Sequence, residues 1–361
     1  MPFPRFVPAQ PAKITKRSHL NTESVACFGD MNRSIMYAFL ASLTLVAAGI
    51  APASAVEPSH PVPLDPAPEV VHQSAATTPE QQRAVAAYWT PDRMAAALPL
   101  PSALDDLPVS LSLLGGRRAS DTDTDTDTDT TSLSDSSVRR WTGGGLVAAT
   151  TGRVYLTLDG VDYTCTASVI NAQNRDTVLT AGHCLKNKTG SWAENWIFVP
   201  GYADGRAPYG RYTARDMLVS PKWSRQGDDS YDFGFVVLNT DLRGRHVADR
   251  TGAQKVSFSG RIAPYVHAFG YPSSPPYSGR HLYYCAGATH ADRQGTLGSG
   301  MDCAMTQGSS GGPWFADFDT TTGTGTITSL TSFKYTDNAA VQYGPRLGDE
   351  ARRVYEAAQI L

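Results

Sequence analysis

The sequence predicts an all-β domain that runs from about Trp141 to the C-terminus and ends in one helix. Two observations lead to this prediction: short runs of β-branched and aromatic residues, and the Gly, Pro and Asp residues that break them without helical periodicity in between. Frequent short strands with turn signals are typical of a β-sandwich or a β-barrel. The clearest runs are residues 154–158, 163–170, 177–179, 196–199, 233–238, 265–269 and 326–333.

Two local signals support single elements of this domain. Asp159-Gly160 separates the first two runs, and this dipeptide is a strong signal for a two-residue β-hairpin. Near the C-terminus, Asp349 is a possible helix cap. Behind it, apolar side chains recur at helical spacing and would form one face. They are Ala351, Val354, Tyr355, Ala358 and Leu361.

The N-terminal 55 residues read as an export signal. Residues 35–50 are apolar, Arg33 precedes them, and the small residues Ala53-Ser54-Ala55 follow, which is the pattern of a cleaved secretory signal peptide. A membrane span needs about 20 apolar residues, so the shorter run favours cleavage. We therefore expect an extracellular mature protein without a membrane contact. Translation could also begin at Met31.

Residues 56–140 differ from the domain that follows. They are rich in Pro, Ala and Asp and contain an Asp-Thr repeat at residues 121–129, which offers nothing to bury. Two short helices are expected within this region, because Thr78 and Thr90 can each cap a helix that has Pro in its first turn. These helices would cover residues 79–88 and 91–98. We interpret residues 56–140 as a propeptide and low-complexity linker, and residues 141–361 as the main domain.

Charge and cysteine usage limit the partners and cofactors. The formal net charge of −3 provides no basic field for nucleic acid. Cys27 lies in the part that would be removed, and an even number of cysteines in an exported chain predicts disulfides. The four that remain are Cys165, Cys184, Cys285 and Cys303. Three pairings are possible, and proximity in sequence favours Cys165 with Cys184 and Cys285 with Cys303. No Cys-x-x-Cys or His-x-x-x-His spacing suggests zinc, so neither a metal nor an organic cofactor is expected.

The sharpest chemical signal is Ser310 in the run Gly-Ser-Ser-Gly-Gly-Pro at residues 308–313. Glycines on both sides allow a tight turn that exposes one hydroxyl while nearby N–H groups converge on a developing oxyanion. The run also fits Gly-x-Ser-x-Gly, the nucleophile elbow of α/β-hydrolases. In that fold the catalytic His follows the Ser, but the last His of this chain is His290. The elbow is therefore disfavoured.

A general base must lie upstream of Ser310. Thr180-Ala181-Gly182-His183-Cys184 ends an apolar strand with a His beside a cysteine, and His183 could take the proton of the Ser310 hydroxyl. A buried carboxylate would hold the imidazole in one tautomer. Asp232 fits this need because a mostly apolar strand follows it, whereas Asp228 and Asp229 lie in a more polar stretch.

The three motifs, in the order His183, Asp232, Ser310, resemble those of chymotrypsin-like (trypsin-like) serine peptidases. The resemblance covers about residues 145–345 and is closest to secreted bacterial members, including the glutamyl endopeptidase branch. It implies two antiparallel β-barrels of chymotrypsin type with the triad between them, and backbone N–H groups of Gly308 and Ser310 as the oxyanion hole. The C-terminal helix would pack on the outside of the second barrel.

The same resemblance implies a substrate pocket formed by Ala304 and the run Ser332-Phe333-Lys334. Ala304 is not an acid, which disfavours a preference for Arg or Lys. Lys334 could attract an acidic substrate side chain or point to solvent, and Ser332 would hydrogen-bond Asp232. Two features depart from the family: Ser309 stands where trypsin relatives have Asp, and Cys303 lies further before the nucleophile than their cysteine does.

The expectation is therefore a secreted, monomeric serine endopeptidase made as a zymogen and acting on protein or peptide substrates through an acyl-enzyme. Two alternatives remain open at this point: a secreted triad esterase of small substrates, and a catalytically silent homologue that binds peptides.

Overall fold

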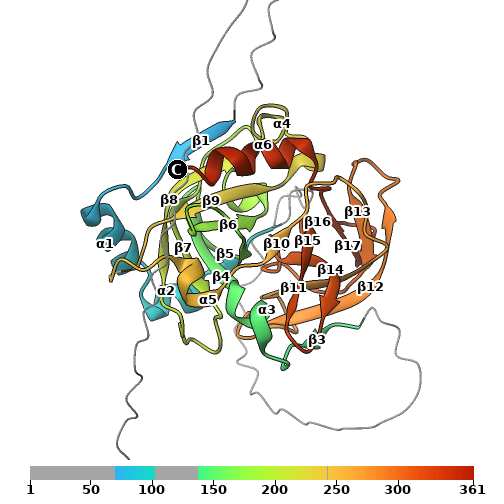
Figure 1. Cartoon of the computed structure of the whole chain (residues 1–361), viewed down its shortest axis with the longest axis horizontal. Helices are drawn as coiled ribbons and strands as arrows, with labels where there is room; N and C mark the ends of the chain where they lie inside the picture. The colour runs from blue at the N-terminus through green and yellow to red at the C-terminus, as the bar shows by residue number, and fades with distance from the viewer. Residues whose placement is uncertain (1–69, 102–136, 242) are drawn as a thin grey trace, which may run out of the picture. The chain divides into compact units, whose positions relative to one another are not determined.

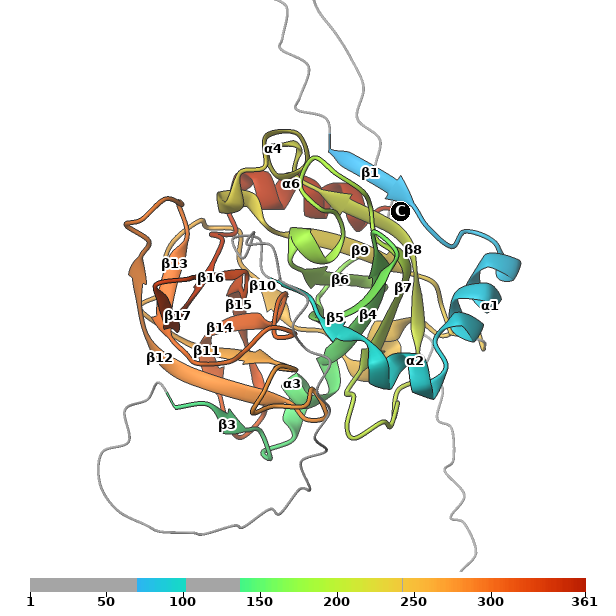
Figure 2. The same cartoon turned by 180° about the vertical axis from the view of Figure 1, so that it is seen from behind.

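The computed structural model describes residues 70–101, 137–241 and 243–361. The expected signal peptide and the Asp-Thr repeat lie outside these residues. The all-β fold class is confirmed, because strands dominate the described domain (Figures 1 and 2). None of the helices within the described ranges is both long and apolar enough to cross a membrane.

Six strands form a closed antiparallel barrel in the order β4-β5-β6-β9-β8-β7 and back to β4. Every residue of β4 is buried, because one face packs into the barrel core and the other is covered by the N-terminal segment. Val154 belongs to the main core cluster, whereas Tyr155 packs on Trp89 of the N-terminal segment. The strands are β4 (Thr151–Leu158), β5 (Val161–Val169), β6 (Thr177–Thr180), β7 (Glu194–Pro200), β8 (Tyr212–Val219) and β9 (Gly234–Leu238).

A second sheet follows in the chain, with strand order β10-β15-β14-β11-β12-β13-β17-β16 and with β3 (Arg139–Arg140) paired to β12. Its strands are antiparallel except for the short pair β10 and β15. Their bounds are β10 (Lys255–Val256), β11 (Tyr265–Gly270), β12 (Tyr283–Ala291), β13 (Ser299–Asp302), β14 (Pro313–Asp319), β15 (Thr324–Leu330), β16 (Phe333–Tyr335) and β17 (Asn338–Gly344).

The described part of the N-terminal region is more than a linker. β1 (Val71–Ser74) extends the barrel sheet along β8, and α1 (Pro79–Tyr88) begins at the Thr78 cap as predicted. α2 (Pro91–Ala96) begins at the Thr90 cap but ends before residue 98, because Ala97 is extended and leads into β2 (Leu98–Pro99), which pairs in parallel with β5. Sequence composition missed this docking, since it depends on a few buried side chains: Trp89 at 1% exposure, together with Ala76, Met94, Ala97 and Leu100.

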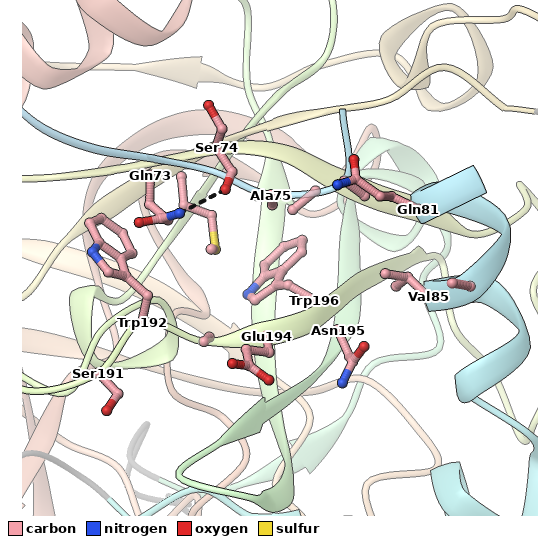
Figure 3. Close-up of a pocket in the computed structure, with 15 residues that line it drawn as sticks. Gln73, Ser74, Ala75, Gln81, Val85, Ser191, Trp192, Glu194, Asn195 and Trp196 are labelled. Carbon is pink, nitrogen blue, oxygen red and sulfur yellow. Dashed lines mark hydrogen bonds between the residues drawn. The ribbon is translucent and has the colours of Figure 1, made fainter. Parts of the chain in front are cut away.

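Docking of this segment is incomplete. A cavity of about 490 Å³ lies between the segment and the barrel wall. Gln73 of β1 and Val85 of α1 face Trp196 of β7 across it (Figure 3).

The helices of the main domain correct the sequence analysis in two respects. Three short helices were not predicted: α3 (Gly145–Thr150), α4 (Pro221–Gln226) and α5 (Val247–Thr251). The predicted C-terminal helix, α6 (Asp349–Ala358), is present, but Gly348 rather than Asp349 is its N-cap.

α6 packs on the first barrel, not on the second as expected. It lies across β8 and β9 (Figures 1 and 2), where its Tyr355 contacts Phe235 of β9 at a ring-centroid distance of 5.8 Å. Ala351, Val354 and Ala358 are fully buried there, whereas Leu361 lies beyond the helix and is 43% exposed. The outer face of β9 is apolar and requires a cover, which the period of the helix could not reveal.

The loops close as the local signals indicated. Asp159 and Gly160 have φ of 50° and 79° and join β4 to β5 as a hairpin. Two disulfides are present: Cys165 with Cys184, which ties β5 to the loop after β6, and Cys285 with Cys303, which ties β12 to the chain after β13.

Candidate active site

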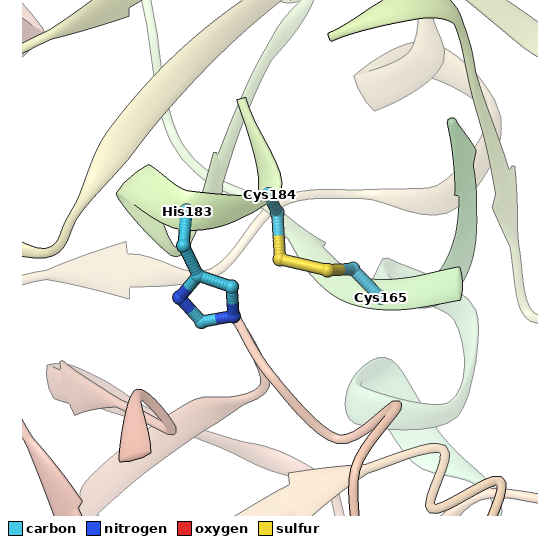
Figure 4. A group of neighbouring side chains, drawn as sticks. All are labelled: Cys165, His183 and Cys184. Atoms are coloured by element: carbon cyan, nitrogen blue, oxygen red, sulfur yellow. A yellow bond between two sulfur atoms is a disulfide. The ribbon is translucent and has the colours of Figure 1, made fainter. Parts of the chain in front are cut away.

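His183 lies in a single 3-10 turn, η1 (Gly182–Cys184), directly after β6. The disulfide of the next residue, Cys184, fixes this turn to β5 (Figure 4). A Cβ at position 182 would lie 3.0 Å from Asp232 Oδ1 and 3.1 Å from the Trp223 ring, a tight contact, so glycine lets this turn pack closely on both. The result is a histidine that is only 5% exposed and whose backbone has little freedom to move.

Asp232 is the carboxylate that faces this histidine. It follows η2 (Asp229–Tyr231), precedes β9 and is fully buried. Its Oδ2 lies 2.7 Å from His183 Nδ1, and its Oδ1 accepts a hydrogen bond of 2.7 Å from the His183 backbone N–H. Ser332, which follows β15 of the second sheet, donates its hydroxyl to Oδ2.

The surroundings of Asp232 keep it ionised. Burial acts to raise the pKa of this carboxyl, but the adjacent His183 and the hydrogen bonds from His183 and Ser332 outweigh burial. The pKa therefore lies below its usual value.

The two neighbouring acids make different contacts. Asp228 accepts a hydrogen bond from the backbone N–H of Ser230 and so caps η2. Asp229 lies 3.2 Å from the Lys188 ammonium, and burial, only partly offset by that ammonium, raises its pKa. Asp232 is thus the acid that contacts His183.

Ser310 is held at the turn before β14 by the first barrel. Thr166 of β5 donates its backbone N–H to the Ser310 carbonyl at 2.7 Å and its hydroxyl to the Gly308 carbonyl at 2.9 Å. The Ser310 carbonyl also lies 3.8 Å from the sulfur of Cys184, the residue after His183. The loop that carries Ser310 and the turn that carries His183 are therefore in contact at the junction of the two sheets.

The peptide groups around Ser310 have defined directions. Gly308 has a φ of 95°, which favours glycine. The carbonyls of Gln307 and Ser309 accept hydrogen bonds from Ser273 and Gly312. In a trans peptide the N–H points opposite to the carbonyl, so the next N–H groups, those of Gly308 and Ser310, point away from these partners. Within the described chain neither N–H makes a hydrogen bond.

His183 Nε2 has no hydrogen-bond partner among the described residues, so the structure contains no bond between Nε2 and the Ser310 hydroxyl. In enzymes without substrate such bonds are often long and tighten only in the complex. Among the described residues, the imidazole therefore presents an unengaged nitrogen.

The predicted pocket residues line one cavity with Ser310, about 630 Å³ in volume. Ala304 and Phe333 contribute to its walls, and Ser332 links it to Asp232. Lys334 donates from its ammonium to the carbonyls of Cys303 at 2.8 Å and Ala339 at 2.6 Å. It thus brings positive charge to the wall of the pocket.

Three residues that border the nucleophile were missed by the sequence analysis. Thr166, Thr306 and Gln342 contact Gly308 or Ser309, and the last two also line the 630 Å³ cavity. Gln342 lies on β17, and nothing in its local sequence distinguishes it. Only the pairing of β17 with β13 brings it beneath Ser309.

The cluster of Cys165, His183 and Cys184 does not fit a metal ion, although its ligand-type atoms lie within 4.8 Å of one another. A metal binds the thiolate form of cysteine. Both sulfurs are joined to each other here (Figure 4), and His183 Nδ1 is directed at Asp232.

Comparisons with known proteins agree with this geometry. The family model described as Trypsin matches residues 143–344, which is more than half of the chain. The crystal structure of the protease Anisep from Arthrobacter nicotinovorans is 37% identical, with a TM-score of 0.56 over 59% of this chain and 96% of that one. A thermostable serine protease, AL20, from an extremophilic microorganism is 34% identical, with a TM-score of 0.56 over 60% of this chain and 99% of that one.

Two further relatives are more limited. A Glu endopeptidase is 18% identical, with a TM-score of 0.51 over 63% of this chain and 99% of that one, and shows the shared fold. A protein named extracellular metalloprotease from Bacillus subtilis (strain 168) is 34% identical over 77 residues, which is 21% of this chain and 24% of that protein. The chain thus matches about a quarter of the length of that relative.

The lowered pKa of Asp232 predicts how stability depends on pH. A carboxyl with a depressed folded-state pKa contributes stability above its unfolded pKa of about 4 and loses it as pH falls through the folded value. In a Ser310→Ala background that prevents self-digestion, we expect Asp232→Asn to be less stable to urea at pH 7, with the difference shrinking between pH 5 and pH 3.

Asp229→Asn is the matched control, because the pKa of Asp229 is raised whereas that of Asp232 is lowered. The stability of the parent relative to that variant should rise, not fall, as the solution is acidified. A gap for Asp232→Asn that stays constant or widens between pH 5 and pH 3 contradicts the assignment of an ionised, stabilised carboxylate.

Proposed function

The chain belongs to the trypsin family and is a serine endopeptidase, and from that premise we propose that it is a secreted enzyme whose triad is His183, Asp232 and Ser310. The observation that carries the triad is the buried pair of His183 Nδ1 and Asp232 Oδ2 at 2.7 Å, which leaves Nε2 unengaged among the described residues. The loop of Ser310 contacts the turn that carries His183, through the Cys184 sulfur. Substrates are proteins or peptides.

The chemistry follows from the directions of these groups. The Asp232 carboxylate accepts a hydrogen bond from the Nδ1–H of His183, which leaves Nε2 unprotonated. Nε2 can therefore take the proton of the Ser310 hydroxyl while Oγ bonds to the scissile carbonyl carbon. His183 then passes that proton to the leaving amine as the C–N bond breaks, which leaves an acyl-enzyme. Water repeats the sequence, with Nε2 as its base, and releases the acid and the Ser310 hydroxyl.

The N–H groups of Gly308 and Ser310 are suited to bind the oxyanion that forms in both steps. No described residue pairs with them, and their directions are set by the bonded carbonyls of Gln307 and Ser309. Loss of one such donor typically costs about 3 kcal/mol of transition-state stabilisation.

Export is supported by the two disulfides, since such bonds persist in oxidising surroundings. The signal at residues 1–55 is the sequence feature that would direct it. For the pocket, the Lys334 ammonium on the wall and the absence of an acid at Ala304 disfavour Arg and Lys side chains.

The docked N-terminal segment supports a zymogen with residues 56–140 as the propeptide. Its Leu100 donates its backbone N–H to the Thr164 carbonyl at 3.2 Å and is 4% exposed. Leu100 and Pro101 line a cavity of about 260 Å³ together with His183. The segment would therefore obstruct the cleft on the histidine side until cleavage. The exposed dibasic pair Arg139-Arg140 is the cleavage site we propose, and its pairing with β12 would have to open for a protease to reach it.

Beyond that dibasic pair, Trp141 is already integrated into the second sheet. Its N–H donates to the Leu282 carbonyl at 2.8 Å and its ring contacts Phe269, Tyr284 and Phe318. A domain of residues 141–361 would thus begin with an anchored residue.

The triad is tested by substitution. Ser310→Ala should abolish turnover and labelling by an organophosphonate, while the protein remains folded by circular dichroism. Asp232→Asn should lower kcat by about ten-thousandfold, as in triad enzymes generally. Asp229→Asn, which alters an acid three positions away, should be nearly neutral. The aspartate assignment is wrong if Asp229→Asn is the more damaging change.

One assay separates endopeptidase from esterase, which differ in the substrate they prefer rather than in the triad. Rapid hydrolysis of an activated ester with no cleavage of casein by the processed protein would favour the esterase.

Obstruction by the segment is tested in an unprocessed chain carrying Arg139→Ala and Arg140→Ala. In that background Leu100→Asp should raise kcat/KM on a peptide by at least about tenfold, or about 1.4 kcal/mol, because a buried carboxylate at position 100 would undock the chain beside His183. Leu98→Asp is the matched control, since Leu98 is 54% exposed. An unprocessed parent as active as the processed enzyme, or equal effects of both substitutions, would exclude this role.

A further inference from the structure

Ser309, the residue before the nucleophile, has a hydrogen-bond arrangement with a defined direction. It is 2% exposed, and its Oγ lies 2.7 Å from the Thr306 carbonyl and 3.3 Å from Gln342 Nε2. A carbonyl only accepts, so the single hydroxyl hydrogen of Ser309 is used on Thr306. The contact with Gln342 must then be donated by the amide, which fixes the orientation of the carboxamide.

Gln342 is held on a rigid element. It lies in β17, where it pairs with Met301 of β13, and it is 2% exposed. In the described part of the chain its Oε1 has no hydrogen-bond partner. Burial of a half-satisfied amide is unfavourable, so the bond to Ser309 is the polar interaction that this side chain provides.

The bond lies between the two peptide groups that present the oxyanion donors. The carbonyl of Gln307 is held by Ser273 at 2.8 Å, and that of Ser309 by Gly312 at 2.9 Å. Gly308 and Ser309 connect these two groups, and of the two only Ser309 has a side chain that can be held. Thr306, at the other end of the relay, is itself fixed through its hydroxyl to Ser274.

We propose that Gln342 and Ser309 are positioning residues that hold the oxyanion-hole donors in their working directions, a role that rests on the proposed function. The relay Gln342, Ser309, Thr306 carries no charge and lies wholly within the segment from Thr306 to β17. It therefore requires no ammonium group from a newly formed N-terminus, unlike an acid at position 309, which would need a positive partner when buried. The oxyanion hole is formed whatever the first residue of the enzyme is.

The test measures kcat and KM of the processed enzyme and its variants on one peptide. Gln342→Leu and Ser309→Ala should each lower kcat about ten- to hundredfold with KM changed less than about threefold, because a misplaced donor weakens transition-state binding. The double variant should lose no more than the worse single variant, since both changes break one interaction. Gln342→Glu, whose carboxylate cannot donate, should behave like Gln342→Leu.

Ser329→Ala is the matched control. Ser329 is also a buried serine of the second sheet, and its hydroxyl donates to the Pro345 carbonyl at 2.8 Å. This variant should lose stability yet keep kcat. If Ser329→Ala lowers kcat as much as Ser309→Ala, or if the losses in the double variant are additive, the relay has only a structural role and the proposal is wrong.

A separate measurement tests whether the oxyanion hole forms without the N-terminal ammonium group. Three residues added ahead of the processed N-terminus should leave kcat within about twofold, and kcat should not fall as pH rises through about 8, where an α-amino group loses its proton. A loss above tenfold, or a fall in kcat through that pH range, would overturn the proposal. Failure of the proposed function is distinguishable, because the parent enzyme would then show no stoichiometric burst with an active-site titrant.

Discussion

The buried carboxylate of Asp232 is the interaction on which the rest of the site depends. An ionised carboxylate without water is tolerated only when charge or hydrogen bonds replace its hydration. Asp232 receives them from the His183 backbone, the His183 ring and Ser332. Two of these donors come from the turn after β6 and one comes from the second sheet. Satisfying a single carboxylate therefore requires both sheets to be folded and correctly docked, and the same docking brings the Ser310 loop into contact with the turn that carries His183.

Thr166 links the same two sheets from the other side, because it is a residue of the first barrel that bonds the nucleophile loop before β14. From β5 of the first barrel it bonds the carbonyls of Gly308 and Ser310, and it accepts the Tyr271 N–H of the second sheet through its hydroxyl. Thr164 lies two residues before Thr166 on β5, and its carbonyl accepts the Leu100 N–H of the N-terminal segment. One strand thus supports the nucleophile loop, carries the disulfide that anchors the histidine turn, and binds the segment that we propose obstructs the cleft.

The sequence could predict those features that short motifs determine. His183, Asp232 and Ser310 each lie in a recognisable local pattern, and Asp159-Gly160 and the Thr78 and Thr90 caps produced the expected turn and helices. Features that depend on distant partners were missed or wrong. Gln342 gains its contact only through the pairing of β17, and α6 packs on the first barrel because the outer face of β9 is apolar and needs a cover. The N-terminal segment docks through buried side chains, chiefly Trp89, whose partners lie far along the chain. None of these is encoded in a local spacing.

The central claim is that Ser310, His183 and the two loop N–H groups act together on one reacting carbonyl. The most direct measurement is a crystal structure of the processed enzyme inactivated by a peptidyl phosphonate. We predict a bond from Ser310 Oγ to phosphorus, a phosphoryl oxygen within hydrogen-bond distance of the N–H groups of Gly308 and Ser310, and His183 Nε2 directed at the adduct. An adduct on another residue, or a phosphoryl oxygen turned away from those two N–H groups, would contradict the account.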